Sequence, residues 1–175
     1  MDKTIHVRPL EEEDFTAFVR LREEALRNEP EAFGPDYDSY STAPLLDKEH
    51  YFERILKYPF SFSLGAFASD GTLIGMGCFT CPYTMIKRRH KGIMWGMYVK
   101  PEYRGRGIGK KIAELILLAA KEDAGCEQVL ITVTPPGSPA HKFYESLGFI
   151  QYGIEYQALK LETGYIDEVL MMKIL

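Results

Sequence analysis

The sequence predicts an α+β (α/β) fold made of seven strands and four helices in a single domain spanning 1–175. Strand and helix patterns alternate along the whole chain, and Asp70-Gly71 gives a hairpin signal between two apolar runs. A glycine-rich run also joins a buried strand to an apolar helix. A chain of 175 residues is long enough to bury one sizeable core and short for two domains.

Helix and strand signals account for the N-terminal half. Acidic residues at 11–14 open the first helix, because carboxylates are favoured at the positive end of a helix. The segment 29–38 holds two prolines, a glycine and four carboxylates, which predicts a loop. The second helix ends where Tyr58 precedes Pro59, since a residue before proline disfavours the helical conformation. The predicted strands cover about 4–9, 61–68, 72–80, 93–99, 129–133, 150–159 and 165–174, and the predicted helices about 11–28, 46–57, 107–123 and 139–147.

Strand and helix signals also account for the C-terminal half of the chain. The run 93–99 is almost continuously apolar, as expected of a strand buried on both faces. The segment 107–123 repeats apolar residues at the spacing of one helix face, and 129–133 is a short β-branched strand. Ser138-Pro139 supplies a helix cap and a first helical residue, and Gly148 closes that helix.

Composition excludes several classes of protein. The net charge is −4, from 21 basic and 25 acidic residues, so we expect no nucleic-acid partner, and the basic cluster Lys87–Lys91 is interpreted as a solvated loop. No apolar run approaches the roughly 18 residues of a membrane span, and the first residues lack a signal-peptide pattern. We therefore expect a cytoplasmic protein without a membrane partner.

The cysteines predict neither a metal site nor a disulfide. Cys78 and Cys81 form a C-x-x-C, but the segment around them has a strand pattern, and side chains three apart on a strand point to opposite faces. Neither a second pair nor a cluster of histidines accompanies them or Cys126. We expect reduced thiols and no bound metal.

The run Arg104–Lys110 is the most informative motif. Glycines at the start of an apolar helix let backbone N–H groups close around a phosphate. A P-loop fails at two of its four fixed positions, and the glycine spacing of a dinucleotide fingerprint fails as well. A tight strand-to-helix turn that binds nothing is the remaining alternative to a phosphate site.

The spacing R-x-x-G-x-G at Arg104, Gly107 and Gly109 resembles the pyrophosphate-binding loop of the GNAT superfamily of N-acetyltransferases. A Tyr-x-x-x-Gly-Phe signature at Tyr144–Phe149 and the order of the elements strengthen the resemblance. It implies the GNAT fold, a central mixed and mostly antiparallel seven-stranded sheet flanked by four helices.

The resemblance also implies acetyl transfer from acetyl-CoA to a primary amine by direct attack on the thioester. Tyr144 corresponds to the tyrosine that protonates the departing thiolate. A backbone N–H of Tyr98 or Val99 stabilises the oxyanion, and we assign it to Tyr98. The cofactor-binding residues implied are Met97, Tyr98, Val99, Arg104, Gly105, Arg106, Gly107, Ile108, Gly109, Lys110, Gly137 and Tyr144.

Two positions depart from the family pattern. Gly137 stands where many relatives carry an asparagine that contacts the cofactor, and Ile93 and Thr132 stand where relatives place a catalytic glutamate. The base would then be a water chain or a carboxylate from the loop 29–38. The alternative is a catalytically weak acyl-CoA-binding or regulatory module.

The acceptor is the least defined part of the site. Phe33 and Tyr37, among the carboxylates of the loop 29–38, and Trp95 are the candidate acceptor-binding residues. The acidic loop would attract a cationic amine, or it is simply solvated, and Trp95 is alternatively a core residue. A small molecule or a protein amine fits this interpretation, and a homodimer is one arrangement compatible with the sequence.

Overall fold

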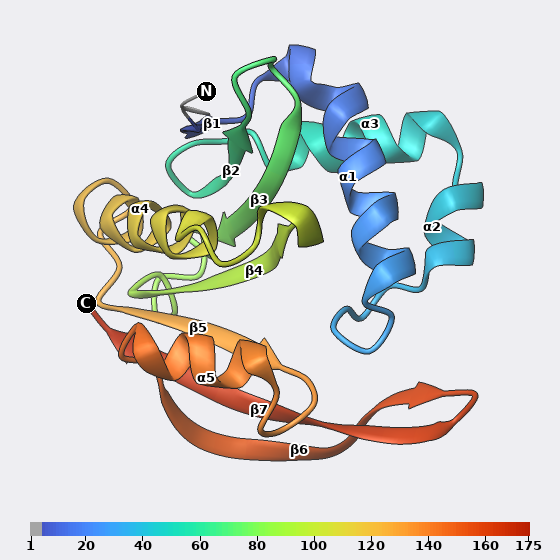
Figure 1. Ribbon diagram of the computed structural model, residues 1–175. Helices are drawn as coiled ribbons and strands as arrows, with labels where there is room; N and C mark the ends of the chain where they lie inside the picture. The colour runs from blue at the N-terminus through green and yellow to red at the C-terminus, as the bar shows by residue number, and fades with distance from the viewer. Residues whose placement is uncertain (1–4) are drawn as a thin grey trace.

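The computed structural model describes residues 5–175 and contains all seven predicted strands in one mixed sheet, with the order β1-β2-β3-β4-β5-β7-β6 (Figure 1). Only β4 and β5 pair in parallel; the other neighbours are antiparallel. The predicted mixed, mostly antiparallel sheet is thus confirmed, although residue 4 of the first strand lies outside the described residues. The strands are β1 (His6–Pro9), β2 (Ser61–Phe67), β3 (Leu73–Thr80), β4 (Lys91–Val99), β5 (Gln128–Val133), β6 (Ile150–Leu161) and β7 (Gly164–Ile174).

The four predicted helices are present, and a short additional one lies where the sequence predicts a loop end. This helix, α2, has no buried residue and therefore no apolar stripe to reveal it in the sequence. Asp36 caps it by accepting a hydrogen bond from the Ser39 N–H at 2.8 Å. The helices are α1 (Phe15–Asn28), α2 (Tyr37–Thr42), α3 (Leu45–Arg54), α4 (Ile108–Glu122) and α5 (Pro139–Ser146), with 3₁₀ turns η1 (Glu12–Asp14) and η2 (Pro101–Tyr103).

The two faces of the sheet carry different helices. The core on one face includes Ile112 and Ile116 of α4 and Tyr144 of α5. The core on the other face includes Phe18 of α1 and Phe52 of α3. The sheet is therefore covered on both faces, as the apolar strands require (Figure 1).

The sheet splits at its centre. β4 and β5 pair only from Lys91 with Gln128 to Ile93 with Leu130. Further along, the register between β3 and β4 shifts, and Gly96 has φ +66° there. Such a bulge bends the strand that carries the extra residue, so β4 turns away from β5 and leaves a wedge between them.

Two absences within the described residues concern membrane spans and metal sites. No helix within 5–175 is long and apolar enough to cross a membrane. Within the same residues, no group of three or more His, Cys, Asp or Glu side chains is placed to hold a metal ion.

The helix α4 packs so closely on β3 that glycine is needed at Gly77. A Cβ at this position would lie 2.8 Å from Cγ2 of Ile112 and 3.0 Å from Cδ1 of Ile116. The Cγ2 methyl cannot move aside easily, because β-branched side chains are rotationally restricted in helices.

We predict that Gly77→Ala lowers the free energy of unfolding by about 1–3 kcal/mol through overpacking, measured by urea denaturation. Gly34→Ala is the matched control, because no heavy atom lies within 4 Å of its added Cβ. We expect the control to change stability by less than about 0.5 kcal/mol. Equal effects of the two substitutions would show that the contact with α4 is not tight.

Candidate active site

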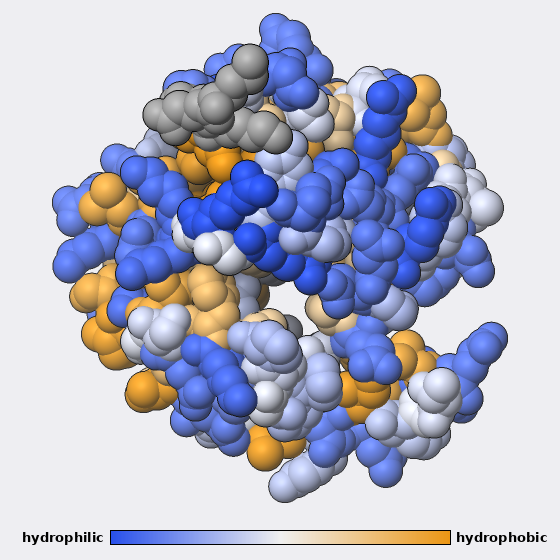
Figure 2. All heavy atoms as spheres, in the orientation of Figure 1, coloured by the Kyte–Doolittle hydropathy of each residue, from blue (hydrophilic) through white to orange (hydrophobic). Residues whose placement is uncertain are grey.

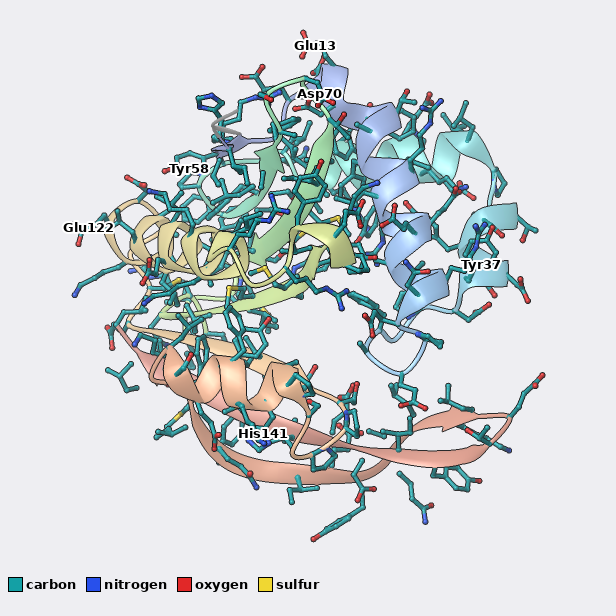
Figure 3. All side chains as sticks on the ribbon, viewed as in Figure 1. Glu13, Tyr37, Tyr58, Asp70, Glu122 and His141 are labelled. Atoms are coloured by element: carbon teal, nitrogen blue, oxygen red, sulfur yellow. The ribbon has the colours of Figure 1, made fainter. Side chains whose placement is uncertain are left out.

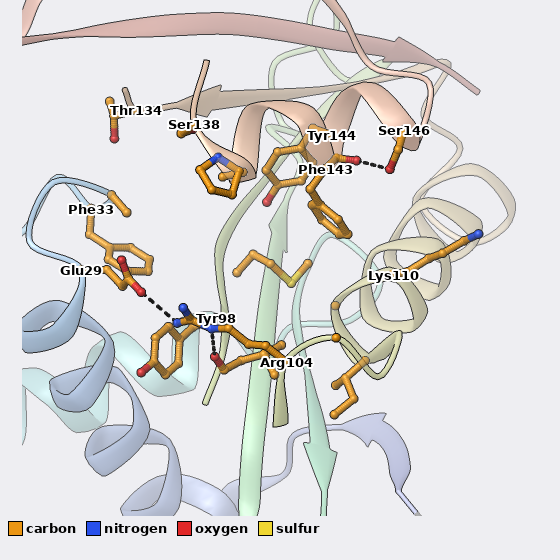
Figure 4. A pocket seen from close by; sticks show the side chains of 18 of the residues that line it. Glu29, Phe33, Tyr98, Arg104, Lys110, Thr134, Ser138, Phe143, Tyr144 and Ser146 are labelled. Atoms are coloured by element: carbon orange, nitrogen blue, oxygen red, sulfur yellow. Dashed lines mark hydrogen bonds and ion pairs between the residues drawn. The ribbon is translucent and has the colours of Figure 1, made fainter. Parts of the chain in front are cut away.

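Two cavities meet in the wedge where β4 leaves β5. The larger has a volume of about 650 Å³ and extends from the glycine-rich loop to the start of α5. The smaller, of about 240 Å³, lies between β4, β5 and the loop after α1. Figure 2 shows a hollow in this region of the surface, and Figure 4 shows the lining of the larger cavity. The residues that line both cavities are Ala32, Phe33, Met97, Thr134, Ala140 and Tyr144.

The glycine-rich loop presents the start of α4 to the larger cavity. Gly105 and Gly107 have φ of +74° and +75°, a conformation that glycine adopts without strain. No side chain caps the helix, and the first backbone hydrogen bond runs from the Lys111 N–H to the Gly107 carbonyl at 2.9 Å. The N–H groups of the first turn, 108–110, are therefore left for a ligand, and their positive end of the helix dipole favours an anion.

The three basic residues of the glycine-rich loop differ in their contacts and in whether they line the larger cavity. Lys110 lines the larger cavity. Arg104 lines it too, but its Nε donates to the Val99 carbonyl at 2.9 Å and its Nη2 pairs with Glu29 at 2.8 Å, so it ties β4 to the end of α1 (Figure 4). Arg106, a predicted cofactor residue, lies outside the lining, because its side chain turns back and donates to the Glu102 carbonyl at 3.0 Å.

The free edge of β4 supplies the backbone groups that face the wedge. The Lys100 N–H donates to the Ile74 carbonyl on β3 at 2.9 Å. Backbone directions alternate along a strand, so the N–H of Tyr98 also faces β3, and the N–H of Val99 faces the wedge. The N–H that faces the wedge is therefore that of Val99 and not that of Tyr98, to which the sequence interpretation assigned the oxyanion.

Tyr144 lies at the junction of the two cavities. It projects from α5 toward β4 (Figure 4), and its ring contacts Phe143 and Phe149 with centroid distances of 5.0 and 5.6 Å. Its hydroxyl makes no hydrogen bond with any residue from 5 to 175, and burial raises its pKa above the usual value for tyrosine. The hydroxyl therefore keeps its proton at neutral pH and is free to donate it.

The predicted acceptor residues separate into two groups. Phe33 lines both cavities, and Trp95 lines the smaller one while its Nε1 donates to the Thr80 hydroxyl at 3.1 Å. Tyr37 lines neither cavity: it is the first residue of α2 (Figure 3), and its hydroxyl accepts a hydrogen bond from Arg27.

Gly137, a predicted cofactor residue, also lies outside both linings. Its N–H is directed to Nδ1 of His141 at 3.0 Å and not toward the cavity. The neighbouring Ser138 and Pro139 line the larger cavity instead.

The acidic loop after α1 keeps most of its negative charge. Glu29 pairs with Arg104, whereas Asp36 caps α2, which lowers the pKa of Asp36 and keeps it ionised. Glu31 lines the larger cavity, and its backbone carbonyl accepts a hydrogen bond from the Thr134 hydroxyl. The loop therefore forms part of the wall of both cavities and carries negative charge there.

Glu168 on β7 is a site residue that sequence reasoning missed. Ile93, Thr132 and Glu168 all line the smaller cavity. Leu170 is the partner of Thr132 on β7, so Glu168 lies two residues further along that strand, past the end of β5. Burial and the charge of Glu155, its partner on β6, raise its pKa. The sequence signal was a single carboxylate beside an apolar run, which is too weak to distinguish from a solvated position.

Comparisons with known proteins agree with this geometry. A family model described as Acetyltransferase (GNAT) family matches residues 17–149. The chain is 37% identical over 76 residues to the thialysine N-epsilon-acetyltransferase of Bos taurus, a match covering 43% of this chain and 44% of the bovine protein. It thus spans less than half of that relative. It is 28% identical over 119 residues to an uncharacterized N-acetyltransferase of Archaeoglobus fulgidus, covering 67% of this chain and 75% of the relative.

Solved structures share the fold over nearly the whole chain. A GNAT-family acetyltransferase from Streptococcus pneumoniae has a TM-score of 0.85 at 21% identity, covering 98% of this chain and 100% of that one. An acetyltransferase from Salmonella typhimurium, solved with its cofactor acetyl-CoA, has a TM-score of 0.83 at 17% identity. The match covers 98% of this chain and 94% of that one.

Proposed function

The chain belongs to the GNAT family of acetyltransferases, and we propose that it transfers an acetyl group from acetyl-CoA to a primary amine by direct attack on the thioester. The observation that carries this proposal is the shape of the wedge. One continuous cavity joins the uncapped start of α4 to the free edge of β4 and meets the smaller cavity at Tyr144.

The larger cavity fits the donor. The N–H groups at the start of α4, with Lys110 beside them, suit a diphosphate. The edge of β4 at Met97–Val99 lies along the way to Tyr144 and offers backbone groups to the amide-bearing arm of coenzyme A. The thioester carbonyl would then lie near the Val99 N–H, which stabilises the negative charge that develops on its oxygen.

The reaction removes two protons from the ammonium nitrogen of the acceptor and supplies one to the departing sulfur. The amine loses a proton before attack, because an alkylamine with a pKa of about 10.4 is almost fully protonated at neutral pH. As the N–C bond forms, the C–S bond breaks, and the thiolate takes a proton from Tyr144. We assign the removal of the first ammonium proton to Glu168, whose pKa is raised above its ordinary value by burial and by Glu155. Nitrogen loses a second proton as the amide forms; that proton restores Tyr144, and Glu168 releases the first to solvent, so both residues are ready for another cycle.

We predict that acetyl-CoA at about 100 times its Kd stabilises the protein by about 2.7 kcal/mol, which a thermal scan detects as a shift of several degrees. Thiol release over a panel of amines then separates an enzyme from a binding module. Gly107→Val should lose the shift. Gly71→Val is the matched control, because both glycines have positive φ and open space at the Cβ position, but Gly71 lies in the hairpin turn. An unchanged shift in Gly107→Val would contradict the loop assignment.

We predict that Tyr144→Phe lowers kcat by about 10²-fold, with KM for acetyl-CoA within about 3-fold, because the ring packing stays and only the proton donor is lost. Initial rates by thiol release are the measurement. Tyr58→Phe, which removes an exposed hydroxyl bonded to Asp123, is the control and should leave kcat unchanged. Turnover at the wild-type rate in Tyr144→Phe would show that Tyr144 is not the proton donor.

We predict that Glu168→Gln lowers kcat/KM by about 10²-fold and removes the acidic limb of its pH profile. Glu155→Gln should retain activity and shift that limb to lower pH, because loss of the neighbouring charge lowers the pKa of Glu168. The raised pKa means that ionised Glu168 destabilises the folded state at neutral pH, so Glu168→Gln should keep or raise Tm. If the acidic limb of the pH profile does not move in Glu155→Gln, that limb reports the titration of a group other than Glu168.

A further inference from the structure

The smaller cavity contains a buried cation without an anionic partner. The Arg22 side chain comes from α1, is 5% exposed and lines this cavity. Its Nε is enclosed and has no hydrogen-bond partner. Leaving a guanidinium buried and unpaired is expensive, because burial removes its water without supplying a compensating charge.

The carboxylates nearest to Arg22 in the sequence of α1 form ion pairs with other residues. Glu23 pairs with Lys48 at 3.0 Å, and Glu24 pairs with Lys100 at 2.9 Å. Cys78 is not an alternative partner, because burial raises its thiol pKa to about 11 and the sulfur stays neutral.

Aromatic rings surround the guanidinium and leave a second unpaired donor beside it. The guanidinium carbon lies 5.4 Å from the ring centroids of Tyr40 and Tyr51 and 5.7 Å from that of Trp95. The hydroxyl of Tyr40 is also buried without a partner, and burial raises its pKa to about 12, so it remains a donor. Aromatic faces offset only part of the charge burial, and they cannot accept hydrogen bonds from these two groups as an anion would.

The bulge in β4 lies against the guanidinium. A Cβ at Gly96 would lie 3.7 Å from Nη1 of Arg22, an ordinary contact distance, so the bulge packs directly beside the cation. Gly96 also has the positive φ that the bulge needs. Both residues line the smaller cavity.

From this arrangement we propose that the acceptor amine also carries a carboxylate, which Arg22 binds in the smaller cavity, so that the substrate is a small amino acid or a close analogue. This inference rests on the proposed acetyl transfer. The cavity of about 240 Å³ equals the volume of about eight water molecules, which suits a molecule of that size. The carboxylate would lie at Arg22, and the amine would lie toward Glu168 and Tyr144. A polyamine fits poorly, because it would bring an ammonium group to a cation.

The test compares amines that differ only in the anion. Each amino acid of a panel is assayed by thiol release beside its carboxamide, its decarboxylated amine and its aminophosphonate. We expect kcat/KM for the best amino acid to exceed that of its amide and its decarboxylated amine by at least about 10²-fold, because a missing partner leaves Arg22 unpaired. Preference for the aminophosphonate over every amino acid, or for the uncharged analogues, would overturn the carboxylate assignment.

Arg22→Gln should erase this preference, raising KM for the amino acid while leaving KM for acetyl-CoA unchanged. Arg20→Gln is the matched control, because Arg20 is an exposed arginine on the same helix. Full preference retained in Arg22→Gln would also overturn the proposal.

A binding measurement separates this proposal from the proposed function. N-acetyl amino acids, with coenzyme A present, should raise Tm of the wild type and not of Arg22→Gln, even if no amine releases thiol. Absence of turnover with every amine would contradict the proposed acetyl transfer but not the carboxylate site. An equal Tm shift in the wild type and Arg22→Gln, or no shift with any N-acetyl amino acid, would overturn the carboxylate site.

Stability of the unliganded protein tests a purely structural role for Arg22. Arg22→Met removes the unpaired charge and keeps much of the volume, so we expect Tm to be equal or higher. A loss of several degrees, with the amino-acid preference retained in Arg22→Lys and Arg22→Gln, would show that Arg22 only supports the fold.

Discussion

The divergence of β4 from β5 is the constraint on which the rest of the site depends. Parallel pairing lasts for three residues on each strand, and the bulge at Gly96 then turns β4 away. Divergence leaves backbone groups of β4 unpaired, and unpaired backbone groups inside a protein require partners. The wedge therefore creates the cavity and also supplies the N–H of Val99 that the proposed reaction uses.

Some of the charges around the wedge are neutralised by local pairs. Arg104 pairs with Glu29, and Lys100 pairs with Glu24, so these residues stabilise the walls. Arg22 and Glu168 are different, because both line the smaller cavity and neither forms an ion pair within 5–175. A cation and a carboxylate facing one small cavity match a molecule that carries both charges.

Much of the fold could be predicted from the sequence, because local patterns report local structure. The hairpin at Asp70-Gly71, the cap Ser138 and the apolar face of α4 each follow from spacing within a few residues. The helix α2 was missed because its six residues bury nothing and leave no periodic signal. The larger cavity was predictable for a related reason: its glycine-rich loop is one continuous segment whose conformation depends on its own glycines.

The sequence by itself determined the order of the elements and the glycine-rich loop at 104–110, and it pointed to Tyr144, which we propose as the acid. The tertiary structure decided which groups face the smaller cavity. Glu168 and Arg22 are 146 positions apart, and only the pairing of β7 with β5 and the packing of α1 on the sheet bring them to one cavity. Hydrogen bonds to Arg27, Glu102 and His141 hold Tyr37, Arg106 and Gly137 outside the cavities, and the pairing of β4 with β3 directs the N–H of Tyr98 toward β3. Spacing along a chain carries no information on such long-range contacts, because the direction of each side chain there is set by the neighbouring elements.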